Sequence, residues 1–260
     1  MSHPLYEKPR TVTPYATVVL ADNPGIMTLD GTNTWVLRAP GAASSIVVDP
    51  GPSDDEHLRQ IVAAAGPISL VLLTHRHDDH SESRAAFSEM VGAPVRAFDP
   101  EFCVGGEPLR DGEVIEDAGL QVRVQHTPGH TSDSVCLVIE DEADPAVLTG
   151  DTILGRGTTV VAYPDGVLGD YLASLQALSE YAAHAALPGH GSELDSTGAV
   201  AEMYLEHRDQ RLQQVRDALG VLGDDATARQ VVEHVYTDVP KENWDAAELS
   251  VQAQLLYLRT

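Results

Sequence analysis

The sequence has 260 residues, 43% of them hydrophobic and 22% charged, a composition typical of a globular protein rather than of a disordered or fibrous one. Its 16 basic and 40 acidic residues give a formal net charge of −24, which keeps a protein in solution and repels polyanions at long range. We therefore expect no broad nucleic-acid-binding face, and a nucleic-acid contact would have to be local and centred on a metal.

The two cysteines, Cys103 and Cys136, predict no disulfide framework, because Cys136 lies inside an apolar run typical of a buried strand. The first ten residues lack the apolar core of a secretory signal peptide. No apolar run approaches the roughly 20 residues that span a bilayer. We therefore expect a cytoplasmic protein without membrane contact.

In chain order, short runs rich in Val, Ile, Leu and Thr, several of them bounded by Gly or Pro, predict strands. The expected strands are 17–20, 34–38, 45–49, 68–74, 95–98, 120–126, 134–140 and 146–149. The spacing of apolar residues between some of them predicts helices. The expected helices are 54–65, 81–91 and 170–183. Strands with helices inserted at intervals predict an α/β fold in which helices sandwich the sheets, and Ser81 is the expected N-cap of its helix.

The last sixty or so residues have a different pattern, since the strand signal ends near Gly198. Helical patterns remain at about 198–220, 226–236 and 244–258. We therefore predict a catalytic domain over 1–197 and a small C-terminal helical module over 198–260. The module would cover the edge of the site or mediate a homodimer.

Most of the chemistry is concentrated in Thr74-His75-Arg76-His77-Asp78-Asp79-His80, which directly continues an apolar strand. Imidazole and carboxylate groups are ligands for zinc and other divalent first-row metals. In an extended chain His75 and His77 leave on the same side, which frees Asp79 and His80 for a neighbouring metal. A turn of surface polar residues is the alternative. Three histidines and two aspartates at the end of a buried strand favour a metal site.

Four ligands do not complete a two-metal site, and the ends of other predicted strands supply further candidates. His130 follows a Pro-Gly turn after the strand at 120–126, and His190 follows a second Pro-Gly pair. Asp151 ends the strand at 146–149 with a carboxylate that can bridge two metals. Each segment alone is as consistent with an ordinary turn, but together with the first motif they predict one site.

These motifs in this order resemble the metallo-β-lactamase fold superfamily, whose signature is His-x-His-x-Asp-His followed by a His, an Asp and a final His. The resemblance implies an αββα sandwich over about residues 14–197 with the site at one edge. The implied ligands are His75, His77 and His130 for one metal, Asp79, His80 and His190 for the other, and Asp151 as the bridge between them.

A finer resemblance connects the chain with the lactamase-beta-like branch, which includes a mitochondrial endoribonuclease and has a winged-helix-like C-terminal module. It rests on residues 23–35 and 155–160, the His207-Arg208 pair and the closing helices. The residues that it implies near the substrate or behind the ligands are Asn33, Thr159, His207 and Arg208.

Asp49 is a further candidate, because it ends a predicted strand just before a Pro-Gly pair. Metal-bound histidines usually need a partner for their outer nitrogen, and Asp49 would supply one. An ordinary Asp-Pro-Gly turn explains the same residues equally well, so both interpretations stay open.

The predicted activity is hydrolysis by a hydroxide that bridges two divalent metals, zinc first and manganese or iron as alternatives. Asp79 is the predicted catalytic residue, since a carboxylate bound to one metal still accepts a hydrogen bond from the bridging water. The resemblance predicts a phosphodiester substrate, single-stranded RNA, whereas the net charge favours a small ester, thioester, lactone or lactam. A mononuclear-iron persulfide dioxygenase and a non-catalytic binding protein fit the full set of seven ligands less well.

Overall fold

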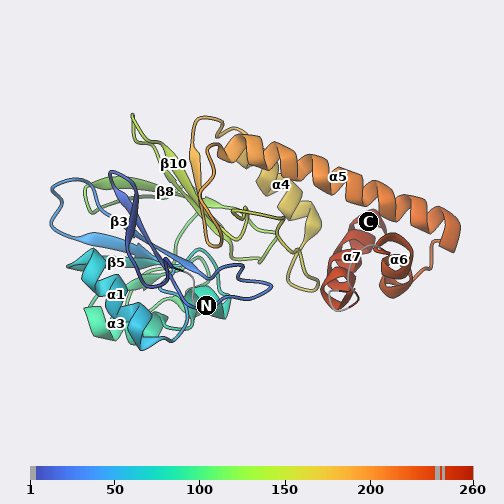
Figure 1. Ribbon diagram of the computed structural model, residues 1–260. Helices are drawn as coiled ribbons and strands as arrows, with labels where there is room; N and C mark the ends of the chain where they lie inside the picture. Colours follow the sequence, from blue (N-terminus) through green and yellow to red (C-terminus); the bar gives the residue numbers. More distant parts are fainter. Residues whose placement is uncertain (1–3, 238–240, 242–243, 260) are drawn as a thin grey trace.

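Two β-sheets packed face to face form the body of the protein, with helices on both outer faces (Figure 1). The computed structural model describes residues 4–237, 241 and 244–259. One core cluster lies between the sheets, and two further clusters lie between each sheet and its helices. The predicted α/β sandwich is therefore correct.

The first sheet holds six strands in chain order. Its strands are β1 (Arg10–Thr13), β2 (Ala16–Leu20), β3 (Asn33–Leu37), β4 (Ser45–Val48), β5 (Ile68–Leu72) and β6 (Val95–Arg96). Its helices are α1 (Asp55–Ala65), α2 (Asp78–Ser81) and α3 (Arg84–Val91), followed by the 3-10 turn η1 (Pro100–Phe102). Because β4, β5 and β6 are parallel, their carboxyl ends meet at one edge of the sheet, where the metal-binding motif begins.

The second sheet holds five strands in the order β11-β10-β9-β8-β7. Its strands are β7 (Val114–Asp117), β8 (Leu120–His126), β9 (Val135–Ile139), β10 (Ala146–Gly150) and β11 (Ala185–Pro188). Helix α4 (Leu168–Leu178) covers its outer face and presents Tyr171 and Leu175 to the core. The parallel pair β10–β11 delivers two more chain segments to the same edge of the sandwich.

Strand β3 shows how the side-chain period of two separates the layers. Trp35 and Leu37 face the core between the sheets, whereas Val36 faces the helical layer of α1. All five residues of β3 are buried, which matches its place inside a sheet covered on both sides.

Most predicted elements lie within a few residues of the observed ones, and the differences have local causes. Strands β1, β7 and β11 were not expected, because each is a short edge strand, and β11 also begins with two alanines. The predicted helix at 81–91 is observed as α3, which begins three residues later, and the short helix α2 precedes it. The N-cap assigned to Ser81 is wrong, since this residue ends α2 and its Oγ donates to the Arg76 carbonyl.

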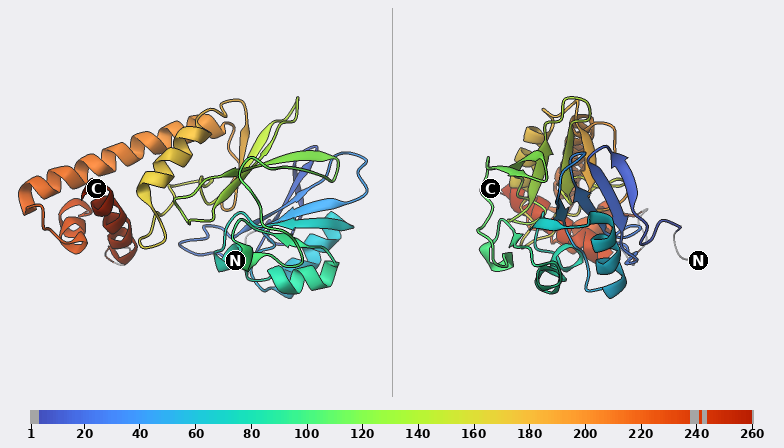
Figure 2. Two further views of the ribbon diagram at one scale, coloured as in Figure 1. Left: turned by 180° about the vertical axis from the view of Figure 1, so that it is seen from behind. Right: turned by 90° about the vertical axis from the view of Figure 1, so that its left-hand side faces the viewer.

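The C-terminal module consists of the second half of the long helix α5 (Thr197–Leu222) with α6 (Ala228–Val235) and α7 (Trp244–Arg259). It projects from one end of the sandwich, and α5 connects the two (Figure 2). The first half of α5 packs on the core under α4, and its second half packs on a separate core with α6 and α7. The predicted boundary at 197/198 lies at the first residues of α5 and stays a prediction. Among the described helices, none is long and apolar enough to cross a bilayer.

Candidate metal centre

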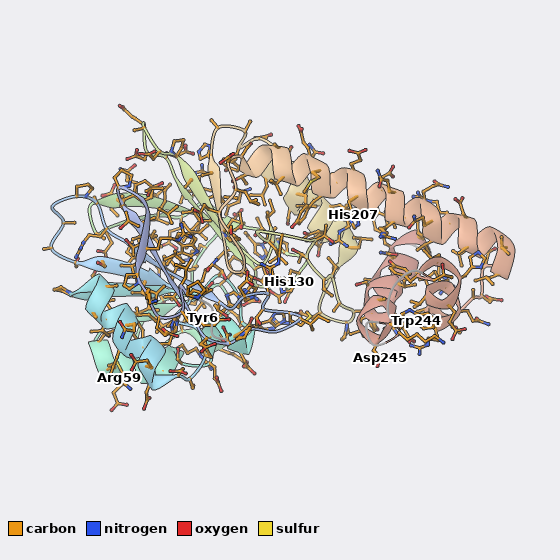
Figure 3. All side chains as sticks on the ribbon, in the orientation of Figure 1. Tyr6, Arg59, His130, His207, Trp244 and Asp245 are labelled. Atoms are coloured by element: carbon orange, nitrogen blue, oxygen red, sulfur yellow. The ribbon has the colours of Figure 1, made fainter. Side chains whose placement is uncertain are left out.

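Loops at the ends of four strands converge at one edge of the sandwich and carry all seven predicted ligands. The loop after β5 brings four of them, and the segments that follow β8, β10 and β11 bring one each. Figure 3 shows His130 at this edge, on the side that faces the C-terminal module. Residues 115 positions apart in the sequence thus meet within one cluster, from His75 to His190.

His75, His77 and His130 form the first group of potential ligands. His77 Nδ1 lies 3.1 Å from His75 Nε2 and 3.1 Å from His130 Nε2. His75 and His130 are buried, whereas His77 is exposed. This group therefore has one side open to solvent.

Asp79, His80 and His190 form the second group. His80 Nε2 and His190 Nε2 lie 3.1 Å apart, and Asp79 Oδ2 lies 3.0 Å from His190 Nε2. The imidazoles of His80 and His190 are fully buried, and the Asp79 side chain is 27% exposed. Asp79 is therefore the member of this group that water and a substrate reach.

Asp151 lies between the two groups with one carboxylate oxygen toward each. Its Oδ1 lies 3.4 Å from His80 Nε2 and 3.5 Å from His190 Nε2, while its Oδ2 lies 3.6 Å from His130 Nε2. Oδ1 is buried and has no hydrogen-bond partner. A buried carboxylate oxygen without a donor is costly unless a cation binds it.

Two of the imidazoles are oriented by backbone carbonyls at their outer nitrogens. His130 Nδ1 donates to the carbonyl of Val160 at 2.8 Å, and His190 Nδ1 donates to the carbonyl of Gly31 at 3.0 Å. With the proton on Nδ1, the inner Nε2 of each ring carries a lone pair directed into the cluster.

Asp49 orients two further imidazoles, those of His80 and His75, through one carboxylate. Its Oδ2 lies 2.9 Å from His80 Nδ1 and accepts the Thr74 hydroxyl at 2.7 Å. The Thr74 oxygen in turn lies 3.1 Å from His75 Nδ1 and can accept its proton. The structure thus places Asp49 where the predicted supporting role requires it, and its φ of 53° turns the chain sharply at this point.

The hydrogen bonds at the outer nitrogens of the histidines indicate whether these residues suit a metal ion. Four rings have their outer nitrogens committed, so the Nε2 lone pairs of His80 and His190 face each other across 3.1 Å, and those of His75 and His130 point at His77 Nδ1. Such an arrangement is repulsive without a positive charge between the nitrogens, and it is the arrangement that divalent metals require of histidine. The donor set of five imidazoles and two carboxylates therefore fits two divalent cations.

The pKa values of His190 and His80 also indicate that the cluster favours positive charge. Burial alone would lower the pKa of His190, but Asp151 and Asp79 raise it to about 9. Burial would also lower the pKa of His80, yet Asp151 and Asp49 hold it well above its usual range. The carboxylates thus favour cationic charge at this position, either as protons or as metal ions.

A change of backbone conformation distributes the first motif between the two groups. His77 has an extended backbone with φ −57° and ψ 143°, and the short helix α2 begins directly after it. His75 and His77 therefore join the first group, while the helical turn directs Asp79 and His80 toward the second. The predicted division of the motif thus requires the helix as well as the extended segment.

Glycines allow the loops to approach closely. A Cβ at Gly189 would lie 2.7 Å from His80 Cε1 and 2.8 Å from Asp151 Oδ1. A Cβ at Gly129 would lie 2.3 Å from Tyr171 Cα. Each Pro-Gly-His segment therefore needs its glycine for close packing, and Gly129 also has a φ of 135°, which favours glycine.

The polar side-chain groups of Asn33 and Thr159 are used to hold the loops rather than left free for a substrate. The Asn33 amide donates to the carbonyls of Pro188 and Gly191, on either side of His190. The Thr159 hydroxyl donates to the carbonyl of Asp151. Both residues therefore support ligand loops, and direct substrate contact by either one stays a prediction.

His207 and Arg208 lie on α5 and are not part of the metal cluster. Arg208 donates to the carbonyl of Thr159, next to the Val160 carbonyl that orients His130. Sequence analysis missed Val160 and Gly31, because a backbone carbonyl carries no residue-type signal. It also missed Thr74 as a partner of Asp49, since only the sheet pairing places the two side by side.

Comparisons with known proteins agree with this geometry. Residues 27–190 match the family model of the metallo-beta-lactamase superfamily, and residues 227–260 match the beta-lactamase associated winged helix domain. The C-terminal module is therefore a winged-helix domain, as the sequence predicted.

Several curated proteins are similar along most of the chain. "Lactamase-like protein vrtG" of Penicillium aethiopicum is 31% identical over 95% of this chain and 81% of its own. An "Atrochrysone carboxyl ACP thioesterase" of Aspergillus chevalieri is 33% identical over 95% and 82%. The "Beta-lactamase-like protein 2 homolog" of Drosophila melanogaster is 32% identical over 91% and 85%.

A solved structure gives the same fold. The metallo-beta-lactamase family protein TTHA1429 from Thermus thermophilus superposes with a TM-score of 0.79 at 24% identity, covering 96% of this chain and 94% of its own. The two-sheet fold, the converging histidines and aspartates and the matched residues agree, and the chain belongs to the metallo-beta-lactamase superfamily.

Proposed function

We propose that the protein is a binuclear metallohydrolase that cleaves acyl compounds, with thioesters as the preferred class. The observation that carries the hydrolytic proposal is the pair of ligand groups joined by Asp151, with the outer nitrogens of four histidines already bonded. Two divalent cations bound there would lower the pKa of a water molecule and polarise the oxygen of the scissile group.

Asp79 is the group that we expect to position the attacking water. Burial would raise the pKa of Asp79, but the hydrogen bond from His190 and the charge of His80 lower it. The group is therefore a carboxylate at neutral pH and accepts a hydrogen bond from water. Its partial exposure allows a substrate to approach, whereas the Asp151 side chain is only 10% exposed.

Two observations favour acyl substrates over RNA. One relative that is similar along most of the chain carries the name of a thioesterase. The net charge of −24 opposes the approach of a polyanion, and RNA-binding enzymes normally present a basic surface. A thioester of a small acyl group makes no such demand.

The test is a side-by-side assay of the zinc-loaded protein on an acyl thioester, a lactone and single-stranded RNA. We expect the thioester to be cleaved fastest and about two equivalents of metal per chain by elemental analysis. Salt-sensitive cleavage of RNA without thioester hydrolysis would instead support the phosphodiester hypothesis. Oxygen consumption with a persulfide and one iron per chain would support the dioxygenase hypothesis.

A matched pair of variants tests the role of Asp79. Asp79→Asn should lower kcat on the thioester by about 100-fold or more. A neutral amide is a weaker hydrogen-bond acceptor than a carboxylate and does not take a proton from the attacking water. Asp78→Asn makes the same chemical change one residue earlier, at an exposed position outside both ligand groups, and should retain activity. Equal activities of the two variants would contradict the assignment.

A further inference from the structure

A second polar cavity lies between the sandwich and the C-terminal module. It encloses about 220 Å³ between α5, α7 and the segment 158–160. Figure 3 shows His207 on α5, between the sandwich and the C-terminal module. The described residues that line it include two arginines and no acidic side chain.

The arginines of this cavity have no carboxylate partner among the described residues. Arg208 is only 5% exposed, and it donates to the carbonyl of Thr159 and lies over the ring of Tyr171. Arg211 donates to Gln214 and lies over the ring of Tyr236. In a chain with 40 acidic residues, two neighbouring guanidinium groups without an acidic partner are unexpected.

Two buried N–H donors on residues that line the cavity have no hydrogen-bond partner. One is Arg208 Nε. The other is His207 Nδ1, since Arg211 Nε donates to His207 Nε2 and so leaves the proton on Nδ1. Gln254 is 3% exposed, leaves its Oε1 without a partner and can present its NH2 group by a half-turn of the carboxamide. Unpaired donors beside positive charge match an oxyanion, whose oxygens accept several such bonds.

The cavity adjoins the metal centre through one short segment. The carbonyl of Thr159 accepts Arg208, and the next carbonyl, of Val160, accepts His130. The Thr159 hydroxyl bonds the backbone of Asp151. Two residues that line the cavity therefore also bond metal ligands, since Val160 accepts from His130 and Thr159 donates to the backbone of Asp151.

We propose that this cavity binds an oxyanion group of the substrate, a carboxylate or a phosphate, and so selects acyl substrates that carry one near the scissile bond. The choice of acyl substrates rests on the proposed function, whereas the binding of an oxyanion does not. The fork of a guanidinium suits both anions, and its local positive charge offsets the repulsion from the acidic surface.

Binding is tested on the zinc-loaded protein by calorimetric titration with inorganic phosphate and, separately, with succinate. Arg211→Gln should weaken the binding of at least one of these anions about tenfold, because it removes a charge-assisted hydrogen bond. Arg216→Gln, at an exposed position of the same helix, is the matched control and should bind like the wild type. Metal content measured in each variant separates this effect from anion binding to zinc.

A second variant tests the same cavity independently, in case Arg211→Gln does not fold. His207→Phe removes the unpaired Nδ1 donor and should weaken the same anion. Equal affinities in wild type, Arg211→Gln and His207→Phe would overturn the proposal. Loss limited to phosphate would identify a phosphate group as the natural ligand, and loss limited to succinate would identify a carboxylate.

Selectivity is tested with two thioesters of N-acetylcysteamine that differ at one end of the acyl chain. Succinyl and butanoyl thioesters have equal chain lengths, but only the first ends in a carboxylate. Arg211→Gln should lower the ratio of kcat/KM for succinyl over butanoyl about tenfold, mainly through KM, while Arg216→Gln should leave this ratio unchanged. An unchanged ratio in Arg211→Gln would overturn substrate selection by a carboxylate. If neither thioester is cleaved, the proposed function fails, and the titrations still decide whether the cavity binds an oxyanion.

Discussion

The metal centre and the cavity beside α5 are both lined by polar side chains and both hold buried atoms without a partner, yet these unpaired atoms are of opposite kinds. In the metal centre the unpaired atom is a carboxylate oxygen of Asp151, and the Nε2 atoms of His80 and His190 face each other. In the cavity the unpaired atoms include the N–H donors of His207 and Arg208. The first region therefore lacks positive charge and the second lacks negative charge.

This difference indicates what each region binds. Buried polar groups in a native fold are normally hydrogen-bonded, so atoms left over mark a missing partner of opposite character. Oriented lone pairs call for a metal ion, and oriented donors on cationic side chains call for an oxyanion. The segment 158–160 lines the cavity and carries the carbonyls that accept hydrogen bonds from His130 and Arg208.

The largest expected effect comes from removing charge between the two ligand groups. Asp151→Asn keeps the shape of the side chain but removes its negative charge, so the zinc-loaded protein should lose metal and about 1000-fold in kcat/KM. Elemental analysis and steady-state kinetics measure both quantities. Full metal content with full activity would show that Asp151 is not the bridge. If the two regions are independent, Arg211→Gln should weaken anion binding as much in the Asp151→Asn protein as in the wild type.

A smaller effect is expected for Asp49, which contacts His80 and Thr74 but is not one of the seven potential ligands. Asp49→Asn leaves all seven potential ligands in place but weakens the acceptor for His80 and Thr74. Changes of this kind typically cost about 10- to 100-fold in metal affinity or activity. Zinc affinity measured with a competing chelator checks this, and the oxyanion affinity of the cavity should not change. Unaltered zinc affinity would contradict a supporting role for Asp49.

The smallest effect is a dependence on pH with opposite signs for the metal-free and metal-loaded protein. In the metal-free protein the pKa of His190 is raised to about 9 from its ordinary value of 6.5. A proton on His190 therefore stabilises this form below about pH 6.5, and the stabilisation is lost as the pH rises through about 9. We expect its Tm to fall by something on the order of 5 °C over this range.

Zinc competes with the same protons, so its affinity should rise with pH over the same range. Thermal unfolding after treatment with a chelator, and zinc titrations at several pH values, measure the two trends. A zinc affinity that is independent of pH between about 6.5 and 9 would contradict the protonation of His190 in the metal-free form.

Much of the metal centre was predictable because its ligands lie at the ends of apolar strands. A run such as 70–74 followed by three histidines predicts metal ligands from neighbouring residues alone, and so do the Pro-Gly-His segments at His130 and His190. The family resemblance then divided the ligands into two groups, and the structure brings the same residues together. The finer resemblance gave the winged-helix module correctly, whereas RNA as the substrate stays a prediction.

The sequence by itself therefore determined the α/β class, the winged-helix module and the seven residues that meet at the edge of the sandwich. Only the tertiary structure decided which nitrogen of each imidazole faces inward, since carbonyls such as those of Val160 and Gly31 have no sequence signature. It also decided that Arg208 and His207 share a cavity with α7. Local patterns specify elements and their ends, whereas cavities and unpaired atoms arise where elements distant in sequence pack together.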